Sequence, residues 1–237
     1  MTKKMTIKAE FNRLKNLIYR RIYMSKISMN EISNRFHILF YDSFMFDRTW
    51  GESRWLGTHV KKCPFDLWVY QEILYRLKPD LIIECGTYKG GSAYYLASIC
   101  DLINNGNIIT IDIVDLPDKP KHPRIKYMTG STLSLEVLDF VAKEVAMAKT
   151  VLVLLDDDHT KDHVLCEMRL YCKFVTTGSY LIVEDTNVNG HPVFPNFGPG
   201  PYEAVLEFLN ENSSFKIDNT MEKFFITFNP NGFLLKV

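Results

Sequence analysis

One stretch, residues 81–97, constrains the fold of this chain more than any other. It begins with a short apolar run, which an acid, Glu84, brings to an end. Ser92 then starts a run of good helix formers. Between these two residues lie three glycines: Gly86, Gly90 and Gly91. This order predicts a strand, a glycine turn and a helix. In an α/β protein, such a unit forms a nucleotide site at the carboxyl end of the strand, because glycine allows a tight turn and a close ligand.

The spacing of the glycines and acids indicates which nucleotide is bound. A dinucleotide fold uses Gly-x-Gly-x-x-Gly to hold a pyrophosphate, whereas here Gly90 follows Gly86 after three residues and Glu84 would repel phosphate. The next strand, 107–111, ends at Asp112, roughly 20 residues past the glycines, where an acid binds ribose hydroxyls in nucleotide folds. The pattern resembles motif I of the class I S-adenosylmethionine-dependent methyltransferases, in which the acid at the Glu84 position lies near the methionine amino group. The alternative is a structural glycine turn in another α/β protein.

The composition indicates which partners the protein binds and in which compartment it works. Formal net charge is +0, so no overall electrostatic attraction to nucleic acid is expected. Five cysteines form no Cys-x-x-Cys pair, and most lie in apolar runs, which is typical of reduced cysteines in a cytoplasmic protein. No apolar run approaches the roughly 20 residues that span a bilayer, and the start of the chain has no continuous apolar core of a secretory signal.

Residues 1–24 are predicted to form a basic amphipathic helix. Its apolar residues recur at spacings of three and four: Ile7, Phe11, Leu14, Ile18 and Ile22. Seven basic residues surround them against a single acid, Glu10. Such a helix can lie on an anionic membrane surface, or it can pack on its own domain or on a second subunit of a homo-oligomer. We expect residues 1–59 to be a helical, aromatic-rich extension and residues 60–237 to be the cofactor-binding domain.

Acidic residues follow two apolar strands in the second half of the chain. The strand at 150–155 ends in three aspartates and a histidine, Asp156, Asp157, Asp158 and His159, and the strand at 180–183 ends in Glu184 and Asp185. Neighbouring carboxylates raise one another's pKa unless a cation intervenes. Because parallel strands end at the same edge of a sheet, these oxygens would form a hard-ligand site that suits Mg²⁺. The alternative is that the acids cap helix N-termini.

Longer motifs resemble one particular family. They are residues 153–164 (VLLDDDHTKDHV), residues 178–186 (GSYLIVEDT), residues 198–205 (GPGPYEAV), residues 228–236, and the upstream residues 62–66 (KCPFD) with 70–72. Together they resemble the cephalosporin hydroxylase / rhamnosyl O-methyltransferase family over roughly residues 49–237. Each motif alone is weak, but the combination is specific.

The resemblance implies a fold and a set of site residues. The fold is a class I methyltransferase (Rossmann-like), doubly wound α/β domain, whose mostly parallel, seven-stranded sheet has helices on both faces. It includes an antiparallel strand among 224–228 and 233–237. The positions that match cofactor-binding residues are Glu84, Gly86, Tyr88, Gly90, Gly91, Ser92, Asp112, Ser131 and Asp156. Ser131 departs from the family pattern, since an acid there usually meets the adenine amine. The implied metal ligands are Asp156 or Asp157, with Glu184 and Asp185.

The implied reaction is a methyl transfer from S-adenosylmethionine to a hydroxyl, with Mg²⁺ as cofactor. The acceptor would be a sugar hydroxyl of a glycan, glycolipid or secondary metabolite, and Asp156 and His159 are the candidate catalytic residues. His159 is the expected base, although a structural role at a helix N-terminus fits its position equally. The loop 187–201 directly follows Glu184 and Asp185 and is a candidate lid. The competing functions are a hydroxylase with a 2-His-1-carboxylate iron site and a non-catalytic scaffold that only binds a nucleoside.

Overall fold

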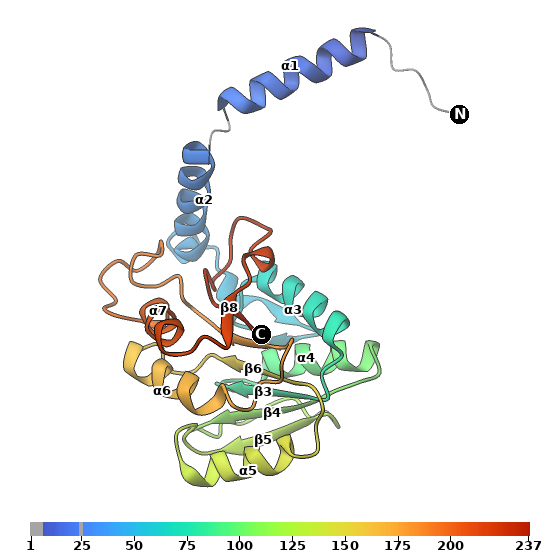
Figure 1. The fold of residues 1–237 in the computed structure, drawn as a ribbon, viewed down its shortest axis with the longest axis vertical. Coiled ribbons are helices and arrows are strands. Elements are labelled where there is room, and N and C mark those ends of the chain that lie inside the picture. The colour runs from blue at the N-terminus through green and yellow to red at the C-terminus, as the bar shows by residue number, and fades with distance from the viewer. Residues whose placement is uncertain (1–6, 24–25) are drawn as a thin grey trace.

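The computed structural model describes residues 7–23 and 26–237, and its centre is one seven-stranded sheet (Figure 1). The strands lie in the order β5-β4-β3-β6-β7-β9-β8. Their bounds are β3 (Leu81–Cys85), β4 (Asn107–Asp112), β5 (Ile125–Thr129), β6 (Val151–Leu155), β7 (Tyr180–Val183), β8 (Phe215–Ile217) and β9 (Phe233–Lys236). β5, β4, β3, β6 and β7 are parallel, whereas β9 runs antiparallel to both β7 and β8. The predicted doubly wound, mostly parallel sheet is therefore confirmed.

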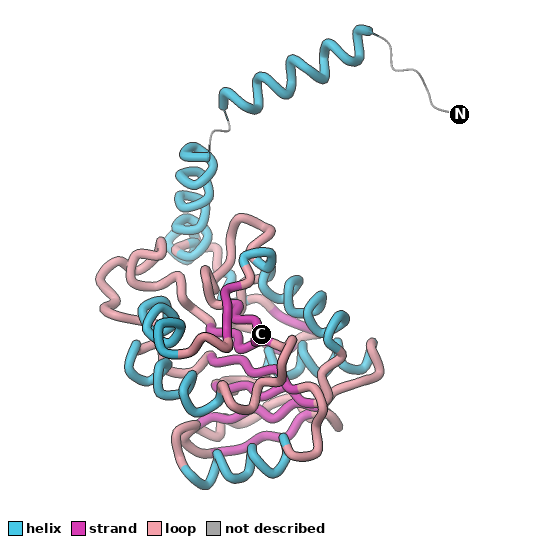
Figure 2. Tube along the Cα trace, in the orientation of Figure 1, coloured by secondary structure: helices cyan, strands magenta, loops and turns pink. Residues whose placement is uncertain are grey.

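Helices cover both faces of the sheet because the central strands are apolar on both sides. Ile83 packs with α5 (Leu135–Val145), α6 (Lys161–Tyr171) and α7 (Pro201–Glu211). Its neighbour Ile82 packs on the other face with α3 (Pro64–Leu77) and α4 (Gly91–Leu102). Both isoleucines are fully buried. The three layers are visible in Figure 2 as strands between two sets of helices.

The strand order fixes where a ligand can bind. β4 lies on one side of β3 and β6 on the other, so the chain reverses its direction of progress across the sheet at β3. In open α/β sheets, a crevice forms at this switch point, outside the carboxyl ends of the strands. The glycine turn after β3 and the acidic residues after β6 and β7 all lie at that edge of the sheet.

The segment before the domain is helical, as predicted. It contains α1 (Ile7–Tyr23), α2 (Lys26–Tyr41), the short 3₁₀ turns Ser43–Phe46 and Trp50–Glu52, and a small hairpin of β1 (Arg54–Trp55) and β2 (Thr58–His59). The end of α2 contacts the domain: His37 is buried, its Nε2 lies 3.0 Å from Asn187 Nδ2, and its ring stacks on Phe228.

The helix α1 stands clear of the domain (Figure 1), and more than half of the surface of Phe11, Leu14 and Ile18 is exposed. Residues 1–6 and 24 of the predicted N-terminal helix lie outside the described residues. No helix within residues 7–23 and 26–237 has the length and apolarity needed to cross a membrane.

One predicted strand is wrong. We expected a strand at 224–228, but the sheet instead takes β8 from Phe215–Ile217. Residues 227 and 228 are bound by Asp66, whose carboxylate accepts hydrogen bonds from Thr227 Oγ1 (2.5 Å) and the Phe228 backbone N–H (2.8 Å). Phe225 is 75% exposed with φ +65°, which breaks the extended pattern. The apolar run 224–228 therefore packs against α2 and α3 rather than within the sheet.

Candidate active site

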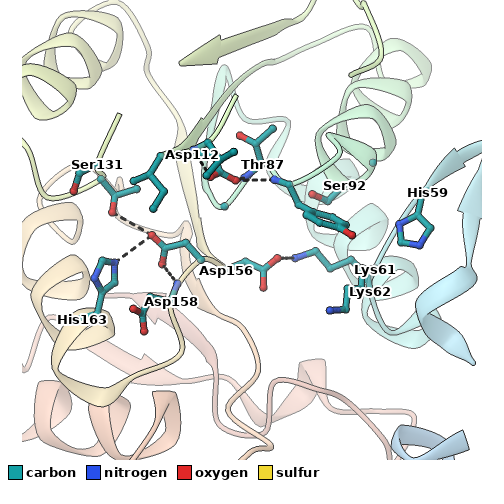
Figure 3. Close-up of a pocket in the computed structure, with 17 residues that line it drawn as sticks. His59, Lys61, Lys62, Thr87, Ser92, Asp112, Ser131, Asp156, Asp158 and His163 are labelled. Atoms are coloured by element: carbon teal, nitrogen blue, oxygen red, sulfur yellow. Dashed lines mark hydrogen bonds and ion pairs between the residues drawn. The ribbon is translucent and has the colours of Figure 1, made fainter. Parts of the chain in front are cut away.

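A cavity of about 490 Å³ lies at the switch point, where β3, β4 and β6 end (Figure 3). Its walls come from residues 59–62, the β3–α4 turn, the end of β4, residues 131–132 and residues 156–163. The predicted cofactor-binding residues that line it are Gly86, Tyr88, Gly91, Ser92, Asp112, Ser131 and Asp156. These predicted residues come from four separate parts of the sequence and meet in one cavity, whereas Glu84 and Gly90 lie outside its lining.

Two glycines of the turn allow chain segments to meet closely. Gly86 has φ +99°, and a Cβ there would lie 1.9 Å from the carbonyl oxygen of Asp156. A Cβ at Gly91 would lie 1.9 Å from the carbonyl oxygen of His59. Real atoms cannot approach so closely, so both positions require glycine. The turn therefore brings the ends of β3 and β6 together, and the start of α4 against the end of β2.

Glu84 is fully buried at the end of β3. Its carboxylate accepts hydrogen bonds from Thr110 Oγ1 (2.6 Å) and from the Ser92 hydroxyl. Burial raises the pKa of Glu84, while the nearby Lys62 ammonium and these two hydroxyls act in the opposite direction. Ser92 lines the cavity and Glu84 does not, so the Ser92 hydroxyl lies between the Glu84 carboxylate and the cavity.

Asp112 is held rigidly at the cavity wall. Its Oδ2 accepts backbone N–H groups from Thr87 (3.1 Å) and Tyr88 (2.8 Å), and its Oδ1 accepts the N–H of Val114 (2.9 Å). An acid at the end of the second strand, fixed in this way, has the position and the acceptor oxygens to bind ribose hydroxyls. Figure 3 shows Asp112 and Thr87 at the same side of the cavity.

The acids after β6 and β7 surround a lysine that the sequence analysis did not identify as a site residue. Lys62 is buried, its Nζ lies 2.6 Å from Glu184 Oε1, and it also forms an ion pair with Asp156 Oδ2. Burial alone lowers the pKa of Lys62, but the Asp156 and Glu184 carboxylates raise it overall above its usual value, so the side chain carries a positive charge. The signal was present in the motif at 62–66, but nothing in the spacing of that motif placed Lys62 among the acids.

Asp185 pairs with the candidate base. His159 Nε2 lies 3.1 Å from Asp185 Oδ2. Burial on its own lowers the pKa of His159, but the Asp185 carboxylate, with Asp156, raises it overall to about 9. Asp156, His159 and Asp185 each offer one ligand atom, and these atoms lie within 4.8 Å of one another. Their side chains are only 20%, 29% and 24% exposed. They therefore form a compact, partly open set of donors.

Asp157 belongs to a different group of side chains. Its Oδ2 accepts from Thr132 Oγ1 (3.2 Å) and lies 3.2 Å from His163 Nε2, and its Oδ1 accepts the N–H of Asp158 (2.6 Å). His163 Nε2 is also 3.6 Å from the buried Glu167. Asp158 accepts the Thr160 N–H at 2.8 Å, just before α6. The three consecutive aspartates thus have three separate roles, and Asp156 is the one grouped with Asp185.

The candidate lid follows β7 and contacts both α2 and α7. Asn187 contacts His37 of α2, as described above. His191 stacks on Tyr202 with 3.8 Å between ring centroids, and its Nε2 lies 2.9 Å from Glu203, so this ring packs against the start of α7. Phe194 is 54% exposed and contacts Tyr41 of α2 edge-on, and no residue of this loop belongs to the lining of the cavity.

Comparison with known proteins adds independent evidence. The family model "Rhamnosyl O-methyltransferase/CmcI" matches residues 47–237. A rhamnosyl O-methyltransferase of Mycobacterium tuberculosis (strain H37Rv) is 36% identical over 217 residues, which cover 86% of this chain and 85% of that protein. A rhamnosyl O-methyltransferase of Mycobacterium leprae (strain TN) is 33% identical over 240 residues, with 97% and 98% covered.

Solved structures show the same fold. The structure titled "CmcI-N160 apo-structure" matches with a TM-score of 0.62 at 21% identity and covers 79% of this chain and 77% of its own. The structure titled "cmcI-D160 Mg-SAM" matches with a TM-score of 0.61 at 19% identity, with 80% and 78% covered. At these identities the likeness concerns the fold of the chain.

Proposed function

Because this chain belongs to the Rhamnosyl O-methyltransferase/CmcI family, we propose that it transfers a methyl group from S-adenosylmethionine to a sugar hydroxyl, with Mg²⁺ as cofactor. The observation that carries the proposal is that Asp112 and Asp156 line one cavity. The first residue is placed for a nucleoside, and the second belongs to a group of cation ligands. The relatives named as rhamnosyl O-methyltransferases make a deoxysugar residue such as a rhamnoside the first acceptor to try.

The cavity offers S-adenosylmethionine contacts along its length. Asp112 binds the ribose hydroxyls, Ser131 faces the adenine, and Ser92 and Tyr88 lie along the glycine turn. Gly86, Gly90, Gly91 and Glu84 shape that turn and orient Ser92. When bound, S-adenosylmethionine supplies the methyl group on a positively charged sulfur. The chain's contribution is to hold this group and the acceptor in line, which supplies much of the acceleration.

The donor set beside the cavity fits Mg²⁺. Asp156 and Asp185 are hard oxygen donors of the kind that Mg²⁺ prefers, and their ligand atoms lie within 4.8 Å of each other and of a ring nitrogen of His159. We propose that these two residues hold the ion, with Glu184 beside them and Asp157 assigned to the cofactor end of the cavity. Bound there, Mg²⁺ acts as a Lewis acid that lowers the pKa of an acceptor hydroxyl and orients it.

His159 is the proposed base. It lies next to the acids of the site, whose charges raise its pKa to about 9. A cation held by Asp156 and Asp185 would offset those charges and leave the ring neutral, so that it could take the acceptor's proton. Asp185 is placed to stabilise the imidazolium that then forms. Asp156 contributes to catalysis as a ligand of the ion that would bind the acceptor hydroxyl. The loop 187–201, with Phe194 exposed, closes over the acceptor.

The two competing functions have less support. An iron hydroxylase site needs two histidines and one carboxylate together, but His159 pairs with Asp185 whereas His163 pairs with Asp157, so the two histidines belong to separate groups. A non-catalytic scaffold would have no need for the acids and the histidine at the end of the cavity.

The helix α1 and the cysteines bear on the assembly and the location of the protein. We assign residues 1–59 to an N-terminal extension whose helix α1 assembles the chain into a homo-oligomer, since its apolar face is exposed in the single chain. Contact of residues 1–24 with an anionic membrane is the second candidate, because α1 carries Arg20 and Arg21 in its last turn. All five cysteines are free, which agrees with a reducing, cytoplasmic location.

Calorimetry with S-adenosylhomocysteine tests the cofactor site. We expect micromolar binding by the wild-type protein and its loss in Asp112→Ala. The matched control is Asp115→Ala, which removes an acid that is 69% exposed and pairs with Lys119. This control should bind as the wild type does. Equal binding by Asp112→Ala and Asp115→Ala, or no binding by the wild type, would overturn the proposed function.

A further inference from the structure

Lys62 occupies an unusual place in the acidic cluster, here defined as Asp156, Glu184 and Asp185. It comes from the segment between β2 and α3, and its side chain is only 4% exposed. Its Nζ contacts Glu184 Oε1 at 2.6 Å and Asp156 Oδ2. The ion pair with Asp156 is drawn as a dashed line in Figure 3. One buried cation therefore joins the carboxylates that follow two neighbouring strands.

Without Lys62, the negative charges of the surrounding carboxylates would exceed the positive charge near them. Three carboxylates lie together, and burial of a charged group is costly unless the group is paired. Asp185 has His159 as its partner, but Asp156 and Glu184 share Lys62. Glu184 is 4% exposed, and its Oε1 has the Lys62 ammonium as its ion-pair partner. A fourth acid, Glu84, is satisfied separately by the hydroxyls of Ser92 and Thr110.

We propose that Lys62 is a positioning residue of the divalent-ion site: its fixed charge holds Asp156 and Glu184 in place, so that the folded cluster does not depend on a bound ion. The inference rests on the proposed Mg²⁺ site. It also goes beyond that site, because it assigns to the Lys62 ammonium part of the positive charge that neutralises the carboxylates. Without Lys62, the carboxylates repel one another in the ion-free protein, and a divalent ion becomes the main source of positive charge.

The alternative is that Lys62 only fastens the segment after β2 to the sheet. A fastening residue contributes the same stability whether or not an ion is present. A residue that substitutes for ion charge contributes most when the ion is absent. The dependence of stability on the ion therefore separates the two roles.

The test compares Lys62→Met with the wild type by thermal unfolding in Mg²⁺ and in EDTA. We expect Mg²⁺ to raise the Tm of Lys62→Met by more than that of the wild type. Calorimetric titration of the variant with Mg²⁺ should show an affinity at least about tenfold higher, because a positive charge close to the ion has been removed. Lys62→Gln keeps hydrogen-bond donors but loses the charge, so it should respond in the same way if Lys62→Met folds poorly.

Two controls bracket the result. Lys62→Arg keeps the charge and should respond to Mg²⁺ as the wild type does. Lys236→Met removes another lysine with fixed partners, whose Nζ donates to the carbonyl oxygens of Cys172 (3.0 Å) and Val175 (2.7 Å) and contacts no carboxylate among the described residues. It should lower the Tm equally in Mg²⁺ and in EDTA.

Three outcomes overturn the inference. If Lys62→Met and Lys62→Gln lose the same Tm in Mg²⁺ and in EDTA while the wild type binds Mg²⁺, Lys62 is a fastening residue and the proposed ion site survives. If both variants stay unfolded even with Mg²⁺, the ion does not replace the lysine. If the wild type binds S-adenosylhomocysteine but no Mg²⁺, the ion site itself fails, and the inference fails with it.

Discussion

At the scale of single residues, the arrangement of the site depends on the partner that each acidic side chain has. Asp156, Asp157 and Asp158 are consecutive in the sequence, yet they pair with Lys62, His163 and the Thr160 N–H respectively. A strand end turns the side chains of successive residues in different directions. Sequence reasoning could therefore predict an acidic site but could not choose among the three aspartates. It missed Lys62 because its partners are 94 and 122 residues away along the chain.

His159 is the residue whose loss should affect chemistry without affecting cofactor binding. We expect His159→Ala to lower kcat by roughly 10²–10⁴-fold, the usual contribution of a general base. Its affinity for S-adenosylhomocysteine should stay close to that of the wild type. Methyl transfer under single-turnover conditions is the measurement. His122→Ala is the control, since His122 pairs with Asp101, away from the cavity. A His159→Ala enzyme as fast as His122→Ala would remove His159 from the mechanism.

At the scale of elements, the sequence predicted the strand–turn–helix unit. It predicted that the glycines allow a close approach, but not what approaches them. The apolar run, the glycines and the helix formers gave β3, the turn and α4 directly. The sequence suggested that glycine lets a ligand come close, whereas Gly86 and Gly91 admit the backbones of Asp156 and His59. The strand expected at 224–228 does not form, because the buried Asp66 of α3 accepts hydrogen bonds from Thr227 and Phe228 and holds that segment outside the sheet.

Gly91 should be less tolerant of a side chain than a glycine with open space around it. Gly91→Ala forces the His59 carbonyl to move, and we expect a loss of about 1–3 kcal/mol in the free energy of unfolding and weaker S-adenosylhomocysteine binding. Gly178 has φ +82° but nothing within 4 Å of an added Cβ. Gly178→Ala should cost less, about 1–2 kcal/mol for a left-handed conformation, and should leave binding unchanged. Equal binding losses in both variants would contradict the close approach inferred at Gly91.

Asp66, which joins α3 to residues 227–228, should make stability depend on pH. Burial raises the pKa of Asp66 to about 7, although the hydrogen bonds from Thr227 and Phe228 lower it. The folded state therefore binds this proton more tightly than the unfolded chain does. The contribution to stability is full below the unfolded pKa of 3.8 and is lost as pH rises through about 7. The span is on the order of 4 kcal/mol.

Asp66→Asn imitates the protonated carboxyl and should lose this dependence. Urea unfolding of both proteins at pH 5 and pH 8 is the measurement. We expect the wild type to lose more stability than Asp66→Asn between these two values, because all other titrating groups are shared. Parallel losses in the two proteins would mean that Asp66 stays ionised in the folded state.

At the scale of the whole molecule, the family and the sheet were predictable because several weak motifs agreed along most of the chain. The expected coverage from about residue 49 corresponds to the observed match at 47–237. The arrangement of the extension was not predictable. Periodicity predicts an amphipathic helix at α1, but it does not say what covers the apolar face, and that face is exposed in the single chain. The boundary between residues 59 and 60 stays a prediction.

Deleting residues 1–24 should lower the solution mass if α1 joins subunits, as measured by light scattering. Replacing Phe11 and Ile18 by serine should have the same effect, since both side chains are more than half exposed. Replacing Arg13 and Arg20 by serine is the matched control and should leave the mass unchanged. If the mass is unchanged in all variants and only the arginine variant releases the protein from anionic vesicles, α1 is a membrane contact.

The central claim is that this cavity transfers a methyl group to a sugar hydroxyl. The most direct measurement incubates the protein with methyl-labelled S-adenosylmethionine, Mg²⁺ and a rhamnoside, and follows the label by mass spectrometry. We predict one labelled methyl on the sugar for the wild type and for Asp115→Ala, and none for Asp112→Ala, for Asp156→Asn or in EDTA. Label transfer that persists in Asp156→Asn and in EDTA, or no transfer to any sugar by a wild-type protein that binds the cofactor, would contradict the account.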